Sequence, residues 1–289
     1  MSKRGAVRRL PAGLFVCLAL VLALVLAGEA RAEGPLVAVV DSGVDATHPD
    51  LAQRVAEGCN VWDGGDTHDA CGHGTNIAGV MAEAAPAARI LPVKAMSDDC
   101  YGTYSRLIAG VECAVEMGAQ VILIASGAYF DSPALHAAVS AARQSGVLLV
   151  AGAGNDGTAA PFYPAAYEEV VTVAGVDRLG APYWRTNYGP HVDIAGPALE
   201  VRCAAAGGGY DVCSGTSSAG AYVAGAAAHV WALRPEWNAD EVAAHLCAVA
   251  VDCIAPDQGA YCGCGRVNVE RAVRLALPLH VHLPVLLCG

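Results

Sequence analysis

Four polar residues, spread in order along the chain, have side chains that together could cleave an amide bond. Asp41 follows an apolar run, His73 stands in Gly-His-Gly-Thr, Asn155 ends Ala-Gly-Ala-Gly-Asn, and Ser217 stands in Gly-Thr-Ser-Ser. Amide hydrolysis at neutral pH needs a nucleophile, a general base and hydrogen-bond donors for the oxyanion that forms on the substrate carbonyl. A hydroxyl, an imidazole beside a carboxylate, and a side-chain amide could supply these functions.

Each of these residues also has a simpler structural explanation. An aspartate at a strand end and an asparagine beside glycine are most often turn residues. A serine just before a helix is most often its N-cap. The chemical interpretation therefore depends on whether the fold brings all four side chains together.

The apolar pattern alternates between short buried strands and amphipathic helices. Strands are predicted at residues 36–40, 90–93, 121–125, 147–151 and 170–173, and a hairpin at 201–213. Helices are predicted after His73, around 107–115, and at 134–143, 217–233 and 239–249. This alternation predicts a single α/β domain with a mostly parallel central sheet and helices on both faces.

The candidate residues stand where such a sheet would gather them. Asp41, the segment 125–127 and the segment 152–155 each follow a predicted strand, and ligands of open parallel sheets bind beyond the carboxyl ends of the strands. Ser217 leads into a predicted helix, whose N-terminus offers free N–H groups and the positive end of the dipole.

Four segments together resemble the subtilisin-like serine protease family. They are Val37–Val44 around the acid, His73–Gly79, Ala151–Asn155, and Gly215–Ala219 followed by Tyr222–Gly225. The order acid, histidine, serine is also that of the family. The resemblance extends over residues 36–276 and implies a subtilisin-like fold and a serine endopeptidase.

The resemblance also implies a role for each candidate residue. Ser217 would attack the substrate carbonyl and form an acyl-enzyme, His73 would act as general base and then general acid, and Asp41 would orient the imidazole. Asn155 and the N–H of Ser217 would stabilise the oxyanion.

Two backbone segments resemble the edges that hold an extended substrate in this family. The substrate-binding residues implied are Gly102, Tyr104, Ala125, Ser126, Gly127, Ala153 and Gly154. Protein or peptide substrates and a monomer are expected, with no cofactor and no metal. Relatives often carry a calcium-binding loop where this chain has only the short segment after Met81, so we expect that site to be missing.

A second hypothesis, a catalytically silent protease-like binding protein, remains open. Leu123 and Ala125 stand where the family usually has asparagine and serine, and we expect no long folding pro-region before Asp41. The intact set of four candidate residues favours the enzyme. A lipase-type hydrolase is disfavoured because Ser217 lacks the G-x-S-x-G context.

The N-terminal segment has the features of an export signal. Basic residues precede the uncharged apolar run Leu14–Ala27, and Ala30-Arg31-Ala32 has the form that signal peptidase cleaves after. An uncleaved membrane anchor is the alternative, although the run is short for a full span. We expect a signal peptide at 1–32, a secreted peptidase domain at 33–276 that does not insert into the membrane, and an apolar tail of unassigned role at 277–289.

Cysteine content and charge agree with export. Of twelve cysteines, eleven lie beyond Ala32, and oxidising compartments favour disulfides. We predict the pairs Cys59–Cys71 and Cys203–Cys213, while a zinc site using Cys262, Cys264, His280 and His282 is a weaker alternative because their spacing is unusual. The net charge is -11, with Lys94 the only lysine beyond residue 32, so nucleic-acid binding is not expected.

Overall fold

The computed structural model describes residues 34–277, and its elements belong to one compact unit that begins at Pro35. A seven-stranded sheet of order β2-β3-β1-β4-β5-β6-β7 forms its centre, and every neighbouring pair is parallel. The strands are β1 (Leu36–Asp41), β2 (Cys59–Asn60), β3 (Arg89–Lys94), β4 (Val121–Ile124), β5 (Leu148–Gly152), β6 (Val170–Val176) and β7 (Ile194–Pro197). The α/β class and the parallel sheet predicted from the sequence are confirmed.

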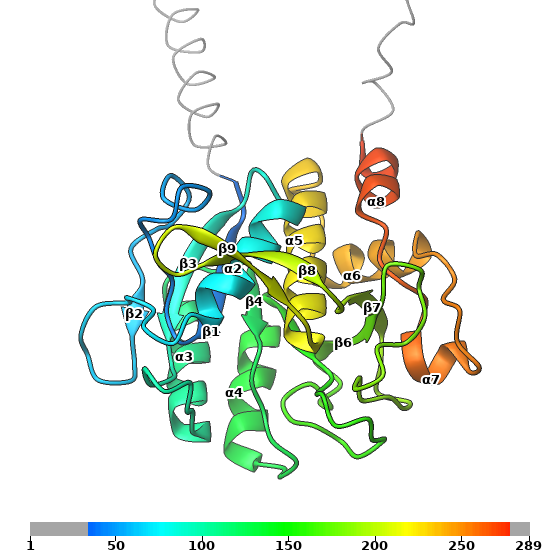
Figure 1. The fold of residues 1–289 in the computed structure, drawn as a ribbon, viewed down its shortest axis with the longest axis horizontal. Helices are drawn as coiled ribbons and strands as arrows, with labels where there is room; N and C mark the ends of the chain where they lie inside the picture. The colour runs from blue at the N-terminus through cyan, green and yellow to red at the C-terminus, as the bar shows by residue number, and fades with distance from the viewer. Residues whose placement is uncertain (1–33, 278–289) are drawn as a thin grey trace, which may run out of the picture. The chain divides into compact units, whose positions relative to one another are not determined.

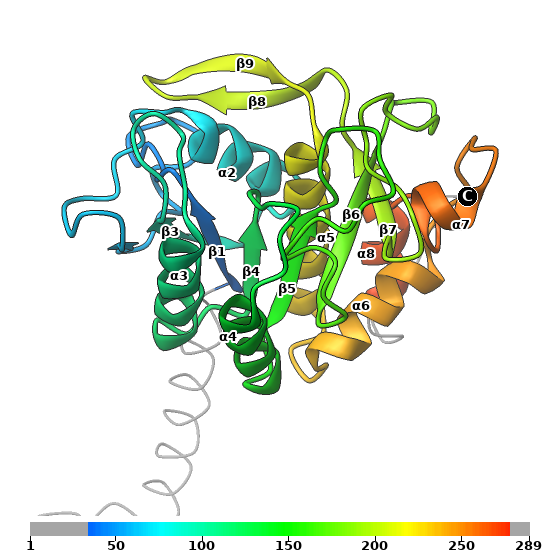
Figure 2. The ribbon, with the colours of Figure 1, turned by 90° about the horizontal axis from the view of Figure 1, so that it is seen from below.

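Helices cover both faces of this sheet (Figures 1 and 2). One face carries α2 (His73–Ala84), α5 (Thr216–Leu233), α6 (Ala239–Ala248) and α8 (Val269–Ala276), and the other carries α3 (Tyr104–Glu116) and α4 (Pro133–Gln144). Successive side chains of β4 alternate between the two layers: Val121 and Leu123 pack against α2 and α5, while Ile122 and Ile124 pack against α3 and α4. This period of two explains why the buried strands are apolar throughout.

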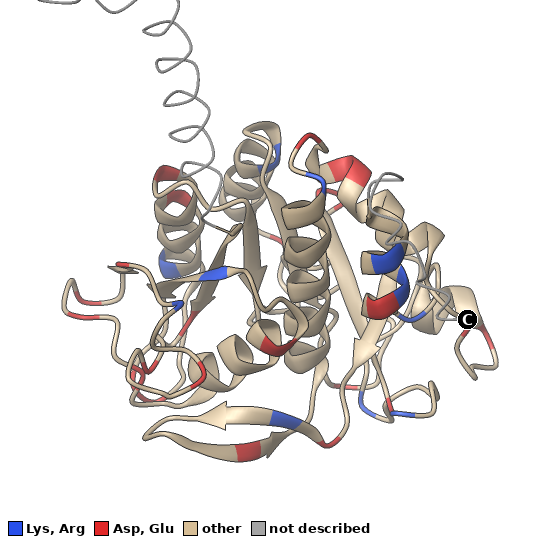
Figure 3. Ribbon diagram, turned by 90° about the horizontal axis from the view of Figure 1, so that it is seen from above, with Lys and Arg blue, Asp and Glu red and all other residues tan. Residues whose placement is uncertain are grey.

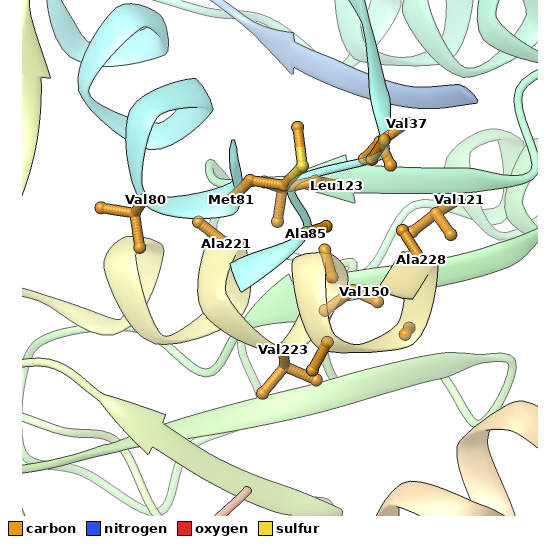
Figure 4. Close-up of a cluster of buried hydrophobic side chains, with 14 of the residues drawn as sticks. Val37, Val80, Met81, Ala85, Val121, Leu123, Val150, Ala221, Val223 and Ala228 are labelled. Atoms are coloured by element: carbon orange, nitrogen blue, oxygen red, sulfur yellow. The ribbon is translucent and has the colours of Figure 1, made fainter. Parts of the chain in front are cut away.

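The helix α5 runs through the centre of the larger core. Its small side chains, among them Ala221 and Ala228, lie against Met81 of α2 and Leu123 of β4 (Figure 4). A Cβ atom at Gly225 would lie 2.5 Å from the carbonyl oxygen of Met81, so the crossing of α2 and α5 requires a glycine there. Because α5 is buried almost all round, its sequence is rich in alanine and lacks an amphipathic pattern.

The predicted hairpin at 201–213 is confirmed as β8 (Val201–Ala205) and β9 (Gly209–Cys213), which pair antiparallel outside the central sheet. Cys203 lies opposite Asp211 and Cys213 opposite Val201, so the two cysteines are diagonal neighbours. The structure joins them by a disulfide, as predicted.

The predicted pair Cys59–Cys71 is wrong. Cys59 of β2 bonds to Cys113 of α3, and Cys71 bonds to Cys100, in the loop before α3. Cys59 and Cys71 bracket the loop that leads to His73, but Cys59 lies on β2, which pairs with β3 and packs in the layer of α3. Its nearest thiol is therefore Cys113 and not Cys71.

Sequence patterns did not predict four short elements: β2, β7, α8 and α7 (Gln258–Cys262). The two strands have only two and four residues, too few for a periodic signal. Among residues 34–277, no helix combines the length and apolarity that a membrane crossing requires.

Candidate active site

The last residue of β1 and the first residue of α2 form the centre of the site. His73 Nδ1 lies 2.8 Å from Oδ1 and 2.9 Å from Oδ2 of Asp41. Asp41 is completely buried, whereas the His73 side chain is 34% exposed. The carboxylate therefore holds one ring nitrogen inside the protein, and Nε2 is the nitrogen left to act on a substrate.

A buried hydrogen-bond network holds Asp41 and the residues next to His73 in place. Asp41 Oδ1 also accepts from the backbone N–H of Ser42 at 2.8 Å, and Ser42 Oγ donates to Asp69 at 2.8 Å. Asp69, 1% exposed, accepts in addition from Gly72 N and from the N–H and hydroxyl of Thr75. Asp69 thus fixes the loop that carries His73.

Asp69 could not be recognised from the sequence, because it stands in a loop with other acidic residues, among them Asp63 and Asp66. Its position four residues before His73 was the available signal. Only the fold shows that this carboxylate, unlike its neighbours, is buried and fully bonded.

The electrostatics favour a protonated imidazole. The negative charge of Asp41 is the main cause that raises the pKa of His73 above its ordinary value of 6.5, and burial opposes this shift. The hydrogen bond to Asp41 and the charge of Asp69 act in the same direction as the main cause. A proton taken up at Nε2 would therefore be stabilised in place.

Ser217 is the second residue of α5 and is half-buried. Gly215, before the helix, has φ 143°, a conformation that places the chain for the sharp entry into α5 and that side chains rarely adopt. The Ser217 hydroxyl donates to the carbonyl oxygen of Ala125 at 3.2 Å. Its own backbone N–H has no acceptor among residues 34–277, as expected in the first turn of a helix.

Asn155 lies beside the start of α5. The N–H of Thr216 donates to Asn155 Oδ1 at 2.8 Å, and Thr216 Oγ1 accepts from the N–H of Gly154 at 3.1 Å. Because Oδ1 is bonded on the protein side, the amide group presents its Nδ2 donor on the other side. The contact by which Thr216 orients Asn155 could not be read from the sequence.

The predicted substrate-binding residues fall into two groups in the structure. Gly102, Tyr104, Ser126 and Gly127 line one pocket of about 390 Å³, together with Met96, Leu107 and Phe130. Tyr104 begins α3, and its hydroxyl donates to the carbonyl of Phe130 at 2.6 Å. This contact joins the segment that carries Gly102 to the segment that carries Ser126 and Gly127.

Ala153 and Gly154 form the other group, and the protein itself uses much of their backbone. Ala153 donates to Val173 O and accepts from Asn187 Nδ2, while Gly154 donates to Thr216 Oγ1 and accepts from Asn187 N. These residues therefore fix the position of Asn155. Ala125 directly precedes Ser126 and Gly127 of the first group, and its carbonyl accepts a hydrogen bond from Ser217. The residue before Ser217, Thr216, accepts from Gly154 of the second group, so the start of α5 links the two groups.

The cysteines that could have bound zinc are used in disulfides. Cys253 bonds to Cys262 and Cys247 to Cys264, which removes that pair of ligands from the zinc alternative. His280, His282 and Cys288, the eleventh cysteine beyond Ala32, lie outside the described residues, as do the expected signal peptide and nearly all of the tail. Within 34–277, no group of three His, Cys, Asp or Glu side chains is arranged to hold a metal ion.

Comparison with known proteins agrees with the fold. The family model described as the Subtilase family matches residues 32–266. Thermitase of Thermoactinomyces vulgaris is 34% identical over 256 residues, which cover 85% of this chain and 90% of that protein. The thermophilic serine proteinase of Bacillus sp. (strain AK1) is 37% identical over 68% of this chain.

The relatives differ in length. This chain spans 51% to 65% of the length of three of its curated relatives, the strain AK1 proteinase at the lower end. Among solved structures, a cold-adapted subtilisin-like serine proteinase matches with a TM-score of 0.75 and 29% identity, covering 82% of this chain and 88% of that one.

The parallel sheet and the match to a solved subtilisin-like serine proteinase define an α/β protein with a subtilisin-like fold. With a family model that spans most of its length, the chain belongs to the subtilase family.

Proposed function

We propose that this protein is a serine endopeptidase with Ser217 as nucleophile, His73 as general base and acid, and Asp41 as the residue that orients His73. The observation that carries the proposal is the contact between buried Asp41 and His73 Nδ1, in a site that also contains Ser217 and Asn155. Two relatives named as serine proteinases support the same class.

In the first half of the reaction, Ser217 Oγ forms a bond to the carbonyl carbon while its proton moves to His73 Nε2. The carbonyl electron pair moves onto oxygen, where the Ser217 N–H and Asn155 Nδ2 donate to it. When the C–N bond breaks, His73 returns the proton to the amine, which leaves an acyl-enzyme on Ser217.

In the second half, water attacks the acyl carbon and gives a proton to His73. The C–Oγ bond breaks, Oγ takes the proton back, and the free carboxylic acid leaves. In the absence of substrate, the Ser217 hydroxyl donates a hydrogen bond to the carbonyl oxygen of Ala125. This hydrogen bond must break before attack, because the same proton has to move to His73. Such contacts often change when a substrate is bound.

The pocket between Gly102 and Gly127 supports binding of an extended protein or peptide substrate. We propose that residues 102–104 and 125–127 contact the substrate backbone on its two sides. The protein is proposed to be a secreted monomer, exported by the segment 1–32, with 33–276 as the peptidase domain.

The experiment that tests the proposal uses Ser217→Ala and, as a matched control, the adjacent buried Ser218→Ala. Purified wild type is expected to hydrolyse peptides and to be labelled by a fluorophosphonate. Ser217→Ala should lose both, by many orders of magnitude in kcat, because the three residues act as a unit. Ser218→Ala should keep both.

A catalytically silent binding protein remains the competing function, and the same experiment distinguishes the two. Leu123, one of the two substitutions that raised this alternative, is fully buried in the core and does not face the site. Wild type that is neither labelled nor active, yet binds peptides, would contradict the proposed enzyme.

A further inference from the structure

An aromatic side chain lies between the two groups of proposed substrate-binding residues. A Cβ atom built on Gly127 would lie 2.7 Å from Cε1 of Phe162, and one built on Gly154 would lie 3.1 Å from Cγ of the same ring. The ring of Phe162 therefore spans the distance between the backbones of Gly127 and Gly154. None of the contacts described above for the four candidate catalytic residues involves it.

The ring is held in this position by its neighbours. Tyr163 exchanges two backbone hydrogen bonds with Ala128, at 2.8 and 2.9 Å, which ties the segment carrying Phe162 to the one carrying Gly127. The ring of Tyr129 packs edge-on against Phe162 with a centroid distance of 5.1 Å. Tyr129 is in turn bonded through its hydroxyl to Asn187 Nδ2 at 2.9 Å.

The same space is where the reaction would place a substrate side chain. During attack, the carbonyl carbon must lie at Ser217 Oγ and its oxygen near Asn155. The α-carbon of that residue is one bond away, so its side chain must enter between Ala125–Gly127, which contacts Ser217, and Gly154, which precedes Asn155. Phe162 is half-buried, and its ring atoms lie next to Gly127 and Gly154 on the two sides of this space.

We propose that Phe162 fills much of the space between Gly127 and Gly154, where the side chain of the residue before the cleaved bond would bind. Phe162 would thereby restrict cleavage to bonds that follow small residues, such as glycine and alanine. This inference rests on the proposed function and names the substrate class of the same site. Affinity for larger side chains would then come from the neighbouring 390 Å³ pocket, which is lined by Tyr101, Tyr104 and Phe130. A substrate residue farther from the cleaved bond would bind there.

The test uses peptide p-nitroanilides that are identical except for the last residue, which is glycine, alanine, leucine or phenylalanine. For wild type, kcat/KM should be about 100-fold higher with alanine than with phenylalanine, the size expected when a side chain does not fit a pocket. In Phe162→Ala, the phenylalanine substrate should gain about 10- to 100-fold, while the alanine substrate changes little.

Two further variants keep the test decisive. Phe162→Leu retains most of the volume and should widen the preference less than Phe162→Ala, which matters if the larger change impairs folding. Phe130→Ala removes an exposed phenylalanine from the neighbouring pocket. It should change kcat/KM for all four substrates by a similar factor and leave their order unchanged.

Wild type that cleaves after phenylalanine or leucine as well as after alanine would overturn the inference, whatever the variants do. So would a folded Phe162→Ala with unchanged preference. In both cases hydrolysis persists, so the proposed endopeptidase would stand. Absence of hydrolysis together with absence of fluorophosphonate labelling would instead overturn the proposed function and this inference with it.

Discussion

At the scale of single residues, the position of Asn155 depends on one neighbour. Its Oδ1 accepts from the N–H of Thr216, so Nδ2 remains available as a donor. In the proposed mechanism, an amide held in this way would already be oriented for the oxyanion and would need no rearrangement during the reaction.

Replacing Asn155 by alanine should therefore lower kcat and leave KM nearly unchanged, because the lost hydrogen bond forms only in the transition state. We take the size, about 10²- to 10³-fold, from subtilisin, where loss of such a donor has this cost. Steady-state kinetics on one peptide substrate measure it. A change confined to KM would show that Asn155 binds the substrate and not the oxyanion.

The pH dependence follows from the raised pKa of His73. The imidazole must be neutral to act as a base, so activity should fall as the pH drops through a value above 6.5. Asp41→Asn removes the largest cause of the shift, so the acid limb should move to lower pH, and kcat should fall by roughly 10⁴-fold. If the acid limb of the pH profile did not move in Asp41→Asn, Asp41 would not be the main cause of the raised pKa of His73.

The same shift affects stability with the opposite sign. Because the fold raises the pKa of His73, its contribution to stability is present below the unfolded value and is lost as the pH rises through the folded value. Activity and this contribution thus change in opposite directions over the same pH range.

At the scale of elements, one guanidinium donates hydrogen bonds to backbone carbonyl groups at and just after the C-terminal end of α2. Arg54 donates to the carbonyls of Ala82 at 2.9 Å and Ala88 at 3.0 Å, and also to that of Ala85. These carbonyls belong to the end of a helix and to the short connection, residues 85–88, between α2 and β3. A positive charge is also favourable at this end of the helix dipole.

Arg54→Ala should lower the free energy of unfolding by about 2–3 kcal/mol, since it leaves three carbonyls without their charged donor. Arg54→Lys should lose less than Arg54→Ala, because the ammonium keeps the positive charge. It should still be less stable than wild type, because an ammonium cannot reach three acceptors in one plane. Arg178→Ala, at an exposed arginine, is the control. Denaturant unfolding measures all three, and equal stability of the two alanine variants would refute the role of Arg54.

The disulfide Cys71–Cys100 connects two parts of the site. Cys71 stands two residues before His73, and Cys100 lies in the loop that lines the pocket with Gly102 and Tyr104. Its loss frees a loop of 29 residues, worth about 3–4 kcal/mol in the chain-entropy model.

The double variant Cys71→Ala/Cys100→Ala should therefore lose activity at temperatures where its secondary structure is intact. Cys203→Ala/Cys213→Ala, in the β8–β9 hairpin outside the central sheet, is the matched control and should keep its activity better. Activity and circular dichroism followed on one temperature ramp give the comparison. Coincident loss of both signals in the first variant would show that the disulfide stabilises only the whole fold.

At the scale of the whole molecule, the distribution of charged residues affects which partners the protein can attract. Figure 3 shows acidic residues distributed over many loops and helices, and no stripe of basic residues within residues 34–277. The single lysine beyond residue 32, Lys94, is 4% exposed and donates to the backbone of Ser42 and His68 and to Asp98. Such a surface offers little to a polyanion.

Calcium removal should leave the melting temperature unchanged. The connection after α2 is short, and Arg54 occupies carbonyl groups that a calcium ion would need as oxygen ligands. Melting curves with and without EGTA, at constant ionic strength, test this expectation. A fall of many degrees with EGTA would reveal a site elsewhere on the chain.

The sequence by itself indicated the α/β class, five of the seven strands of the central sheet and the four candidate catalytic residues. These features are encoded locally, in apolar periodicity and in short motifs around Asp41, His73, Asn155 and Ser217. The hairpin disulfide was also predictable, because its two cysteines are only 10 residues apart on adjacent strands.

Only the tertiary structure decided which cysteines join Cys59 and Cys71, that Asp69 is buried behind His73, and that Phe162 lies between Gly127 and Gly154. In each case the partner lies on another segment of the chain or the burial depends on how segments pack. A loop residue has no periodic signal, and its neighbours are set by how strands and helices pack. The candidate catalytic residues could therefore be proposed from the sequence, while Phe162, which we propose limits the substrate, could not.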